Sequence, residues 1–319
     1  MMKQYAIGID VGGTTVKIGL FRTEGELLKK WEIRTRTEQE GRFILPDAAA
    51  SVRKSLENEG ISLSEVEGVG IGVPGAVLES GVVNRCVNLG WGVVDVAAEF
   101  SGLLDGLPVQ VGNDANVAAL GEMWKGGGQG FQNMVMVTLG TGVGGGVILN
   151  ERIVHGAFGA AGEIGHICMS DTETECCGCG KRGCLEQYAS ASGIARMAEK
   201  KLLEDDRPTS LRELEKVTAK DIFAAAKAGD ILAMELVEDL GSMLGKALSF
   251  ISCVVDPQAF VIGGGVSGAG SILTDTIQKY YRKSAFHASE ETKFVLATLG
   301  NDAGIYGAVR QVLGQGGST

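Results

Sequence analysis

The segment ECCGCGKRGCLE, residues 175 to 186, holds four cysteines within nine positions, and the residues between them are small or charged. The stretch GEIGHICMSDTETECCGCGKRGC contains one histidine, His166, which lies ten residues before the first cysteine of the cluster. A structural zinc ion takes four nitrogen or sulfur ligands in a tetrahedron. His166 with Cys177, Cys179 and Cys184 supplies such a set, so the spacing predicts a zinc site. Cys176 is a spare sulfur, and by its position it could replace Cys177.

Acidic residues flank the predicted zinc site. Glu163 and His166 share the stretch GEIGH, and Glu186 follows the last cysteine by two positions. A loop held by zinc would fix these side chains, and each carboxylate can accept two hydroxyl groups. The pattern therefore favours a polyhydroxylated ligand. Taken singly, Glu163 and Glu186 are also typical of solvated surface acids.

Two glycine-rich turns, DVGGTT at 10–15 and LGTGVGG at 139–145, each lie between apolar stretches that are typical of strands. Glycine lets backbone N–H groups approach an anion, and threonine adds hydroxyl donors. Neither turn is a P-loop or a dinucleotide fingerprint, because GxxxxGK[ST] is missing and no helix follows. The pair predicts a polyphosphate site, although a single turn of this kind is more often just a tight turn.

The first glycine turn has an acid, Asp10, where the second has Leu139. A carboxylate beside a phosphate site can hold Mg²⁺, usually through water. Lys17 could add positive charge there. Equally, Lys17 could be an ordinary exposed lysine on a strand with no role in binding.

The tetrapeptide GNDA occurs twice, at 112–115 and 300–303, each time before a helical pattern. Both aspartates can be helix N-caps, and this is the interpretation kept for Asp302. Asp114 is expected beside the first glycine turn, where it could accept the proton of an attacking hydroxyl group. Asp114 is thus a candidate general base, with an N-cap as its alternative role.

These motifs recur in the same order in both halves of the chain, which predicts a duplicated α/β fold of two domains around a cleft. Chance similarity of short glycine motifs is the alternative. The recurring pairs are a strand–turn–strand at 5–21 and 134–149, a strand running into glycines at 69–77 and 260–270, and GNDA with its helix at 112–124 and 300–313. Amphipathic helices are predicted over 47–58 and 230–252, and a loop over 205–208.

Composition narrows the class of protein. A length of 319 residues suits about two domains. A net charge of −10 argues against a nucleic-acid surface, and no apolar run is long enough for a membrane helix. Seven cysteines and an N-terminus without room for a signal peptide argue against a disulfide framework. We expect a cytoplasmic protein.

At these motifs the chain resembles the ROK family of sugar kinases and repressors, and within it the glucokinases of Bacillus type. The resemblance covers about residues 5 to 312, and its most specific part is the cysteine motif. The matching stretches are DVGGTTVK, GVPGAV, NLGW, GNDANVAALGEMWKG, TLGTGVGGG, GEIGH and CGCGKRGCLE. The resemblance implies an actin-like, hexokinase-like (ribonuclease H-like) fold and transfer of phosphate from ATP to O6 of a hexose, with glucose favoured.

The resemblance also implies roles for individual residues. Asp114 matches the catalytic base. Sugar contacts are implied for Asn113, Asp114, Glu163, His166 and Glu186, with Gly75 and Asn88 lining the sugar pocket. Phosphate-binding positions are implied for Asp10, Gly12, Gly13, Thr14, Thr15, Gly140, Thr141 and Gly142, with Lys17 as a further candidate, and Gly264 and Gly265 match the adenosine side. Zinc ligands are implied at His166, Cys177, Cys179 and Cys184. Cys176 departs from the family pattern.

The expected domains are a small α/β domain over 1–120, completed by a C-terminal helix at about 303–319, and a large domain over 121–302 with the zinc loop. Expected cofactors are ATP, catalytic Mg²⁺ and structural Zn²⁺. Expected partners are glucose and ATP, in a homodimer without nucleic acid or membrane. N-acetylmannosamine, N-acetylglucosamine and fructose remain alternative substrates, and a sugar-sensing repressor is the alternative from another class.

Overall fold

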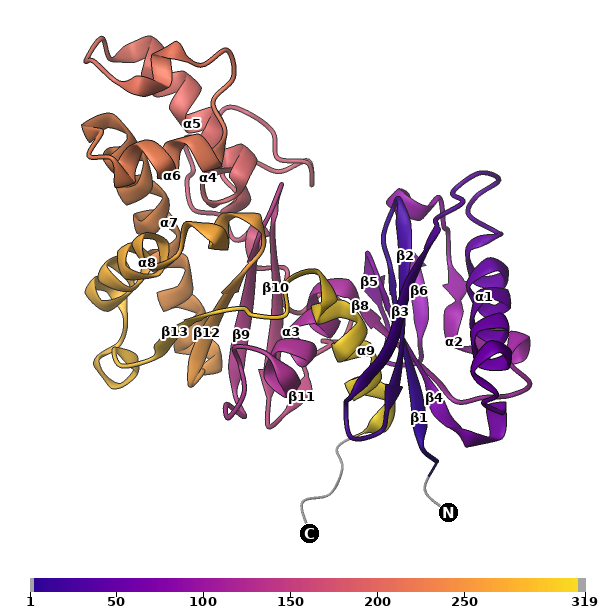
Figure 1. Ribbon diagram of the computed structural model, residues 1–319. Helices are drawn as coiled ribbons and strands as arrows, with labels where there is room; N and C mark the ends of the chain where they lie inside the picture. The colour runs from indigo at the N-terminus through magenta and orange to yellow at the C-terminus, as the bar shows by residue number, and fades with distance from the viewer. Residues whose placement is uncertain (1–2, 315–319) are drawn as a thin grey trace. The chain divides into compact units, whose positions relative to one another are not determined.

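The computed structural model describes residues 3–314, which fold into two compact units (Figure 1). The first unit contains residues 3–132, 146–162 and 299–314, and the second contains 133–145 and 163–298. The predicted boundary between residues 120 and 121 remains a proposal. The predicted C-terminal helix is α9, Ala303–Leu313, and residues 315–319 lie outside the described range.

The first unit is built on a five-stranded sheet of order β3-β2-β1-β4-β8. Its strands are β1 (Tyr5–Val11), β2 (Thr15–Arg22), β3 (Leu27–Arg34), β4 (Val66–Val73) and β8 (Val109–Asn113), and a small sheet is made of β5 (Ala76–Val77), β6 (Val82–Arg85) and β7 (Val94–Asp95). Its helices are α1 (Ile44–Glu59), α2 (Val96–Leu103), α3 (Asp114–Lys125) and α9, with short 3₁₀ turns at Leu63–Glu65, Val87–Leu89 and Gly300–Asp302. Strands β1 and β2 are antiparallel, whereas β1, β4 and β8 run parallel.

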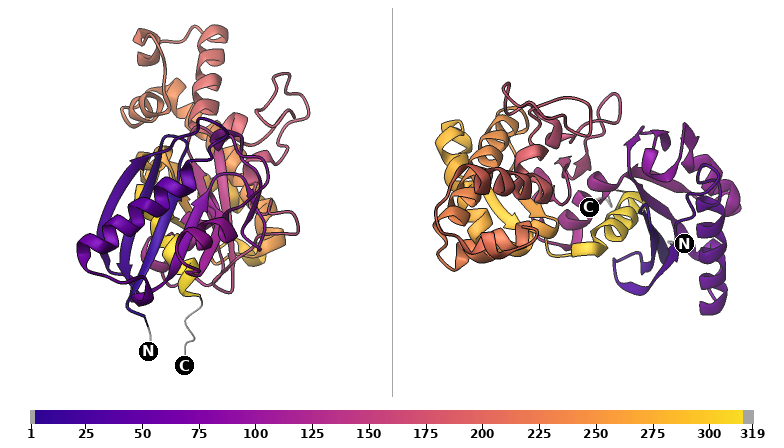
Figure 2. Two further views of the ribbon diagram at one scale, coloured as in Figure 1. Left: turned by 90° about the vertical axis from the view of Figure 1, so that its right-hand side faces the viewer. Right: turned by 90° about the horizontal axis from the view of Figure 1, so that it is seen from above.

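Helices cover both faces of this first sheet. Residues of α1 and α2 join the main hydrophobic cluster on one face, while Ile305 and Val309 of α9 pack with Ala6 and Phe21 on the other. Figure 1 shows α1 and α9 on opposite sides of the strands, and the left view of Figure 2 shows α1 lying across them. Strand β1 is consequently apolar on both faces, as expected for a central strand, whereas β3 alternates between half-buried and exposed residues, as expected at an edge.

The second sheet has the order β11-β10-β9-β12-β13, which repeats the strand order of the first. Its strands are β9 (Met134–Leu139), β10 (Val143–Leu149), β11 (Arg152–Ile153), β12 (Ala259–Gly263) and β13 (Lys293–Leu296). Helices of the second unit are α4 (Glu186–Ala189), α5 (Ala191–Glu204), α6 (Ala219–Lys227), α7 (Ile231–Val255) and α8 (Ser271–Ser284), with 3₁₀ turns at Ile164–His166, Ser210–Glu213, Gly265–Ala269 and His287–Ser289.

The prediction of a duplicated α/β fold is confirmed, and so are the helices expected over 47–58 and 230–252. Among residues 3–314, no helix has the length and apolar character needed to cross a membrane.

Glycines let α9 lie with its backbone directly on the first sheet and on α3. Gly8 and Gly70 are register partners on β1 and β4. A Cβ atom on Gly8 would lie 2.1 Å from the carbonyl oxygen of Ile305, and one on Gly70 would lie 1.7 Å from that of Ala308. On α9 itself, a Cβ atom at Gly307 would lie 1.7 Å from the carbonyl oxygen of Val117 on α3. These backbone contacts cannot be relieved by rotating a side chain.

This packing predicts that Gly307→Ala strongly destabilises the protein, because the added methyl group must push α9 away from α3. Overpacking of this kind costs about 1–3 kcal/mol or more. The matched control is Gly102→Ala on α2, where an added Cβ would meet no atom within 4 Å. That change should be neutral or stabilise the helix by roughly 0.5–1 kcal/mol. Thermal denaturation of both variants is the measurement, and equal melting temperatures would contradict the packing argument.

Candidate active site

The carboxyl ends of three parallel strands place the candidate catalytic residues of the first unit on one edge of its sheet. Asp10 of β1 is in register with Gly72 of β4, which in turn is in register with Gly112 of β8. Two strand spacings separate Asp10 from Gly112, or about 10 Å between Cα atoms. Asp114 begins α3 two residues after Gly112. The expectation that Asp114 lies near the first glycine turn is therefore consistent with the sheet register.

Asn113 is the N-cap of α3, and its amide group is already engaged. Its Oδ1 accepts hydrogen bonds from the backbone N–H groups of Ala115 at 3.0 Å and Asn116 at 3.2 Å. Its Nδ2 donates to the carbonyl oxygen of Gly75 at 3.0 Å. Asp114 is the first helical residue, and its Oδ1 accepts from the N–H of Ala115 at 2.8 Å. The cap role considered for Asp114 thus belongs to Asn113, while the positive end of the α3 dipole favours a charged Asp114.

Gly75 and Asn88, the two residues expected to line a sugar pocket, lie in loops beside this edge. Gly75 has φ +99°, and a Cβ atom on it would lie 2.7 Å from the carbonyl oxygen of Arg85. Asn88 is exposed in the 3₁₀ turn Val87–Leu89. Its carbonyl oxygen would lie 3.9 Å from a Cβ atom on Gly13, so the loop carrying Asn88 runs beside the first glycine turn.

The first glycine turn is a tight connection between β1 and β2, and its tip is exposed. Within it, the N–H of Gly12 donates to the carbonyl oxygen of Thr15 at 2.9 Å. Thr35, the residue that follows β3, supports the turn, because its hydroxyl donates to the carbonyl oxygen of Gly12 at 2.7 Å. Gly13 and Thr14 are exposed to solvent. Hydrogen bonds thus hold the base of the turn at Gly12, while the exposed tip at Gly13 and Thr14 can face a ligand.

Asp10 lies at the base of this turn in a largely buried position. Burial raises the pKa of its carboxyl group, and the positive charge of Lys17 opposes that rise. A Cβ atom on Gly304 of α9 would lie 2.7 Å from the carboxyl carbon of Asp10, so α9 packs directly against the carboxylate. Lys17 donates to the carbonyl oxygen of Asn301 at 3.1 Å. A carboxylate in this position is a suitable ligand for Mg²⁺ or for one of its waters.

Asp302, in the second GNDA motif, does not cap its helix with its side chain, so that prediction is wrong. The carboxylate makes no hydrogen bond to the first backbone N–H groups of α9. Both of its oxygens instead accept from the ammonium group of Lys30 on β3, at 2.7 and 2.9 Å. The reason is local geometry, because the residues before α9 form a 3₁₀ turn and Asp302 itself has φ −99° and ψ −9°. Such a near-helical backbone turns the side chain away from the cap position.

In the second unit, the second glycine turn connects β9 and β10 and is anchored to the start of α5. The N–H of Ala191 donates to the carbonyl oxygen of Gly140 at 2.8 Å. The hydroxyl of Ser192 donates to the carbonyl oxygen of Thr141. Gly142 lies against Glu186, since a Cβ atom on it would be 2.3 Å from Oε2 of that residue and would displace the carboxylate. This turn therefore contacts both α5 and the acid that follows the cysteine cluster.

Gly264 and Gly265 follow β12 beside the end of β9. Gly264 has φ +83°, and a Cβ atom on it would lie 2.5 Å from the carbonyl oxygen of Leu139. Only glycine fits this combination of backbone angle and close approach. Gly265 begins the 3₁₀ turn Gly265–Ala269, and an added Cβ there would meet no atom within 4 Å.

The four predicted zinc ligands lie together in the second unit. The ligand atoms of His166, Cys177, Cys179 and Cys184 are all within 4.8 Å of one another. Cys179 Sγ and Cys184 Sγ are 3.6 Å apart, and His166 Nδ1 lies 3.8 Å from Cys177 Sγ. Tetrahedral bonds of about 2.3 Å from zinc to sulfur require sulfur atoms about 3.8 Å apart. The donor set and its spacing therefore fit zinc. Because four protein ligands would fill the tetrahedron, no coordination position would remain for a catalytic water.

Cys177 rather than Cys176 belongs to this cluster. Cys177 is buried, whereas Cys176 is exposed and pairs through its backbone with Arg182. Two adjacent residues in an extended segment point to opposite sides, so only one of them can face the other ligands. Spacing left this choice open, and the local strand pairing decides it.

Two acids contact the cluster. Glu186 Oε1 accepts from the thiol of Cys177 at 3.1 Å, and its Oε2 accepts from the N–H of Val143 at 3.3 Å. Oε2 of Glu163 lies 3.9 Å from Nε2 of His166, on the ring nitrogen opposite the one that faces Cys177. One nitrogen of His166 can thus bind a metal while the other faces outward beside a carboxylate.

The cysteine loop is fastened to α5 by a charged contact. Arg196 donates to Glu173 at 2.8 Å, and the hydroxyl of Tyr188 donates to the same carboxylate at 2.9 Å. The hydrogen bond from Arg196, reinforced by the others, lowers the pKa of Glu173 to about 2. These two hydrogen bonds hold the start of the cysteine loop whether or not a metal is bound.

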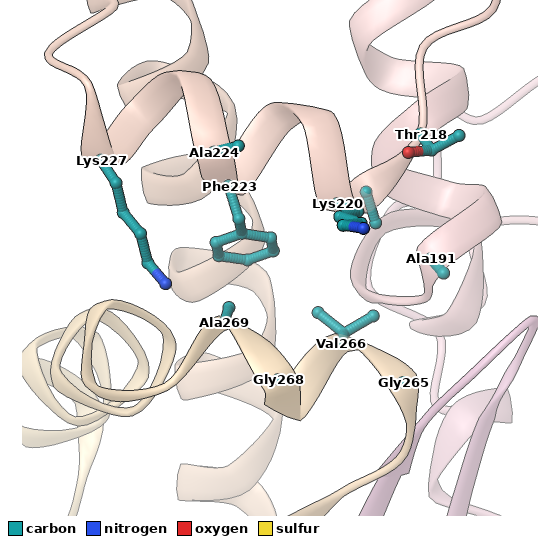
Figure 3. Close-up of a pocket in the computed structure, with 11 residues that line it drawn as sticks. Ala191, Thr218, Lys220, Phe223, Ala224, Lys227, Gly265, Val266, Gly268 and Ala269 are labelled. Carbon is teal, nitrogen blue, oxygen red and sulfur yellow. The ribbon is translucent and has the colours of Figure 1, made fainter.

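A hollow of about 560 Å³ lies between α6 and the turn Gly265–Ala269, and sequence analysis missed most of its residues. Its lining consists of Ala191, Thr218, Ala219, Lys220, Phe223, Ala224, Lys227, Gly265, Val266, Gly268 and Ala269. Figure 3 shows Phe223 pointing from α6 toward the glycine-containing turn. The capping box of Thr218 and Asp221 marks the start of α6 in the sequence, but no local signal says what that helix faces. The hollow is adjacent to Gly265, which was expected on the adenosine side.

Comparison with known proteins gives a consistent result across the chain. The glucokinase of Halalkalibacterium halodurans is 42% identical over 312 residues, which are 96% of this chain and 94% of that protein. The glucokinase of Streptomyces coelicolor is 35% identical over 95% of each chain. A crystal structure of a ROK family glucokinase from Streptomyces griseus in complex with glucose and AMPPNP is 34% identical, covering 96% of this chain and 98% of that one, with a TM-score of 0.74.

Repressors are also among the relatives. A putative xylose repressor of Caldicellulosiruptor is 29% identical over 96% of this chain and 77% of that protein. The family model that matches, described as the ROK family, spans residues 6–314. The glycine turns, both GNDA motifs and the cysteine loop all lie inside that match, and the chain belongs to the ROK family.

Proposed function

We propose that this chain is an ATP-dependent hexokinase that transfers the γ-phosphoryl group of ATP to O6 of D-glucose. The observation that carries the proposal is the 42% identity, over nearly the whole chain, to a glucokinase. The proposal is further supported by a solved relative that binds glucose and an ATP analogue. It is compatible with the geometry, since Asp10 and Asp114 lie on the same edge of the first sheet.

Asp114 is the proposed general base. Phosphoryl transfer to a hydroxyl group needs positioning and charge stabilisation, together with an acceptor for the proton that leaves the hydroxyl. The N-terminus of α3 favours the ionised carboxylate, which can then take the proton from O6. Asn113, whose amide is fixed by the helix and by Gly75, would hold the sugar in position. Its amide must share or exchange these bonds to do so.

The remaining proposed roles follow the chemistry of the side chains. Asn113, Asp114, Glu163, His166 and Glu186 would bind sugar hydroxyls, and Gly75 and Asn88 would line the sugar pocket. The glycine turns, with Asp10, Thr14, Thr15 and Lys17, would hold the phosphates. Mg²⁺, bound through Asp10, would neutralise charge on the phosphates. Zn²⁺ at His166, Cys177, Cys179 and Cys184 would be structural. A homodimer and a cytoplasmic location remain predictions.

The hollow beside α6 is the proposed adenosine site. It is apolar along Phe223, Val266 and Ala269, which suits the flat face of a purine base. Lys220 and Lys227 extend from the same helix and supply positive charge. Gly265, with open space at its Cβ position, lets a ligand approach the backbone closely.

The test of the proposed function is phosphorylation by the full chain with ATP and Mg²⁺ against four sugars. Glucose should be the preferred acceptor over N-acetylmannosamine, N-acetylglucosamine and fructose, and the product should carry phosphate at O6. Preference for an acetamido sugar would indicate that the chain is a kinase of the same family with a different substrate. Sugar binding without phosphorylation of any of the four would favour the repressor class.

Asp114→Asn is expected to lower kcat by roughly 10²–10⁴-fold, because the amide keeps the shape of the side chain but cannot accept the proton. Glucose affinity should change much less, and the acid limb of the pH–rate profile should disappear. Steady-state kinetics and calorimetric titration with glucose measure the two effects separately. A kcat close to that of the wild type would mean that another group or a water takes the proton.

Cys179→Ser is expected to lose both the metal and glucose binding, because structural zinc contributes directly to folding the loop that carries the sugar ligands. Cys176→Ser is the matched control, since this neighbouring thiol is exposed and lies outside the ligand cluster. Zinc per chain is measured by atomic emission, and glucose affinity by calorimetry. Full glucose affinity in a metal-free Cys179→Ser protein would refute the structural role.

Ala224→Phe is expected to raise KM for ATP while leaving KM for glucose unchanged, because the added ring fills the hollow beside α6. Ala228→Phe is the control, an exposed position at the end of the same helix that does not line the hollow. Initial rates at varied ATP and varied glucose separate the two constants. An unchanged KM for ATP would place the nucleoside elsewhere.

A further inference from the structure

Cys168, a cysteine outside the proposed zinc set, lies opposite one of its members, Cys184, in a short antiparallel pairing. The flanking hydrogen bonds run from Met169 N to Gly183 O at 2.6 Å and from Leu185 N to Ile167 O at 2.8 Å. Because these bonds lie on either side of the cysteine pair rather than joining the two residues, the pair is of the non-hydrogen-bonded type. Such pairs have Cα atoms about 4.5 Å apart and side chains on the same face.

This separation is compatible with a disulfide bond. Disulfides in proteins span Cα distances of about 4.4–6.8 Å. The two segments are also held very close, since a Cβ atom on Gly183 would lie 1.8 Å from the carbonyl oxygen of Ser170. Rotation of the Cys168 side chain is then the main movement that a bond between the two sulfur atoms requires.

The two thiols differ in their access to solvent. Cys184 is 1% exposed, and its sulfur lies 3.6 Å from that of Cys179. Cys168 is exposed, and its sulfur has only long contacts, to oxygen atoms of Ser170, Asp171 and Arg182 at 3.7–3.8 Å. An oxidant in solution therefore reaches Cys168 first, and the side chain of Cys168 is free to change rotamer.

We propose that Cys168 and Cys184 form an oxidation-sensitive pair that dismantles the zinc centre when a peroxide is present. The inference rests on the proposed zinc centre. In the first step the thiolate of Cys168 attacks a peroxide oxygen, which breaks the O–O bond and gives a sulfenic acid and hydroxide. The hydroxide takes up the proton that the thiol released and leaves as water. In the second, the sulfur of Cys184 displaces hydroxide from that sulfenic sulfur, which forms the S–S bond. Overall, two thiols and one hydrogen peroxide give one disulfide and two waters.

The consequence for the metal follows from ligand chemistry. A disulfide sulfur carries no thiolate charge, and zinc requires the thiolate. Oxidation of this pair thus leaves His166, Cys177 and Cys179 as an incomplete set. The loop that also carries Glu186 loses its proposed anchor, so oxidation should weaken sugar binding. Reduction by a thiol restores both sulfurs, which suits a reversible response in a reducing compartment.

Cys176 provides the internal comparison. It is equally an exposed thiol in the same loop, but its backbone partner is Arg182. Its neighbour in sequence, Cys177, belongs to the ligand cluster and points to the other side of the segment. No cysteine faces Cys176 across a strand pairing among residues 3–314, so oxidation there should stop at a sulfenic acid or a mixed disulfide.

The experiment treats the zinc-loaded full chain with hydrogen peroxide while a chromogenic chelator reports released zinc. Wild type, Cys168→Ser and Cys176→Ser are compared, and the disulfides are mapped by mass spectrometry of peptides. We expect rapid zinc release from wild type and from Cys176→Ser, with a bond between Cys168 and Cys184. Cys168→Ser should release zinc markedly more slowly. Dithiothreitol and added zinc should restore the metal content and the glucose affinity of the wild type.

Equal rates of zinc release from wild type and Cys168→Ser would overturn the proposal, and so would a map in which Cys184 pairs only with Cys177 or Cys179. The zinc content of the reduced wild type is measured first, and it tests the metal centre separately. If that protein binds no zinc but the bond between Cys168 and Cys184 still forms, the zinc assignment fails while the oxidation-sensitive pair remains.

Discussion

The direct backbone contact of α9 with the first sheet is the constraint on which the rest of the first unit depends. The chain returns from the second unit at Leu299, and α9 then packs on strands formed by the first residues of the chain. Glycines on both sides remove the side chains that would hold the backbones apart. The same helix covers Asp10, and the carbonyl of Asn301 just before it accepts from Lys17. The carboxylate proposed for the metal is therefore buried by a segment about 290 residues away in sequence.

A buried acid, Glu122, holds the chain at Leu299, where it re-enters the first unit. Glu122 on α3 is fully buried, and its two oxygens accept hydrogen bonds from the backbone N–H groups of Gly127 and Leu299, each at 2.8 Å. A buried carboxylate is tolerated only when such donors satisfy it. Because α3 begins with Asp114 and contains Glu122 near its end, one helix links the candidate base to the first residues of the C-terminal segment.

The second unit uses a different device for its functional loop. Residues 171–185 are mostly exposed and contribute few apolar side chains, so they cannot be held by a hydrophobic core. The four proposed zinc ligands would take that role, together with the contact of Arg196 with Glu173. If zinc holds this loop as proposed, the order of the loop would depend on the redox state of the ligand cysteines, and Cys168 lies opposite one of them, Cys184.

Local chemistry that lies in short stretches was determined by the sequence alone: the duplicated order of glycine turns and GNDA motifs, the strand–turn–strand around Asp10, and a His and three Cys with zinc-ligand spacing. Each depends on residues within a few positions of one another, where backbone geometry links sequence to structure directly. Tertiary structure decided what depends on partners distant in the chain. It drew Asp302 to Lys30 and created the hollow between α6 and Gly265, because packing across elements follows from strand register and helix contact, which no local pattern encodes. The choice of Cys177 over Cys176, and of Asn113 rather than Asp114 as the cap of α3, follows from local backbone geometry that the residue types alone left open.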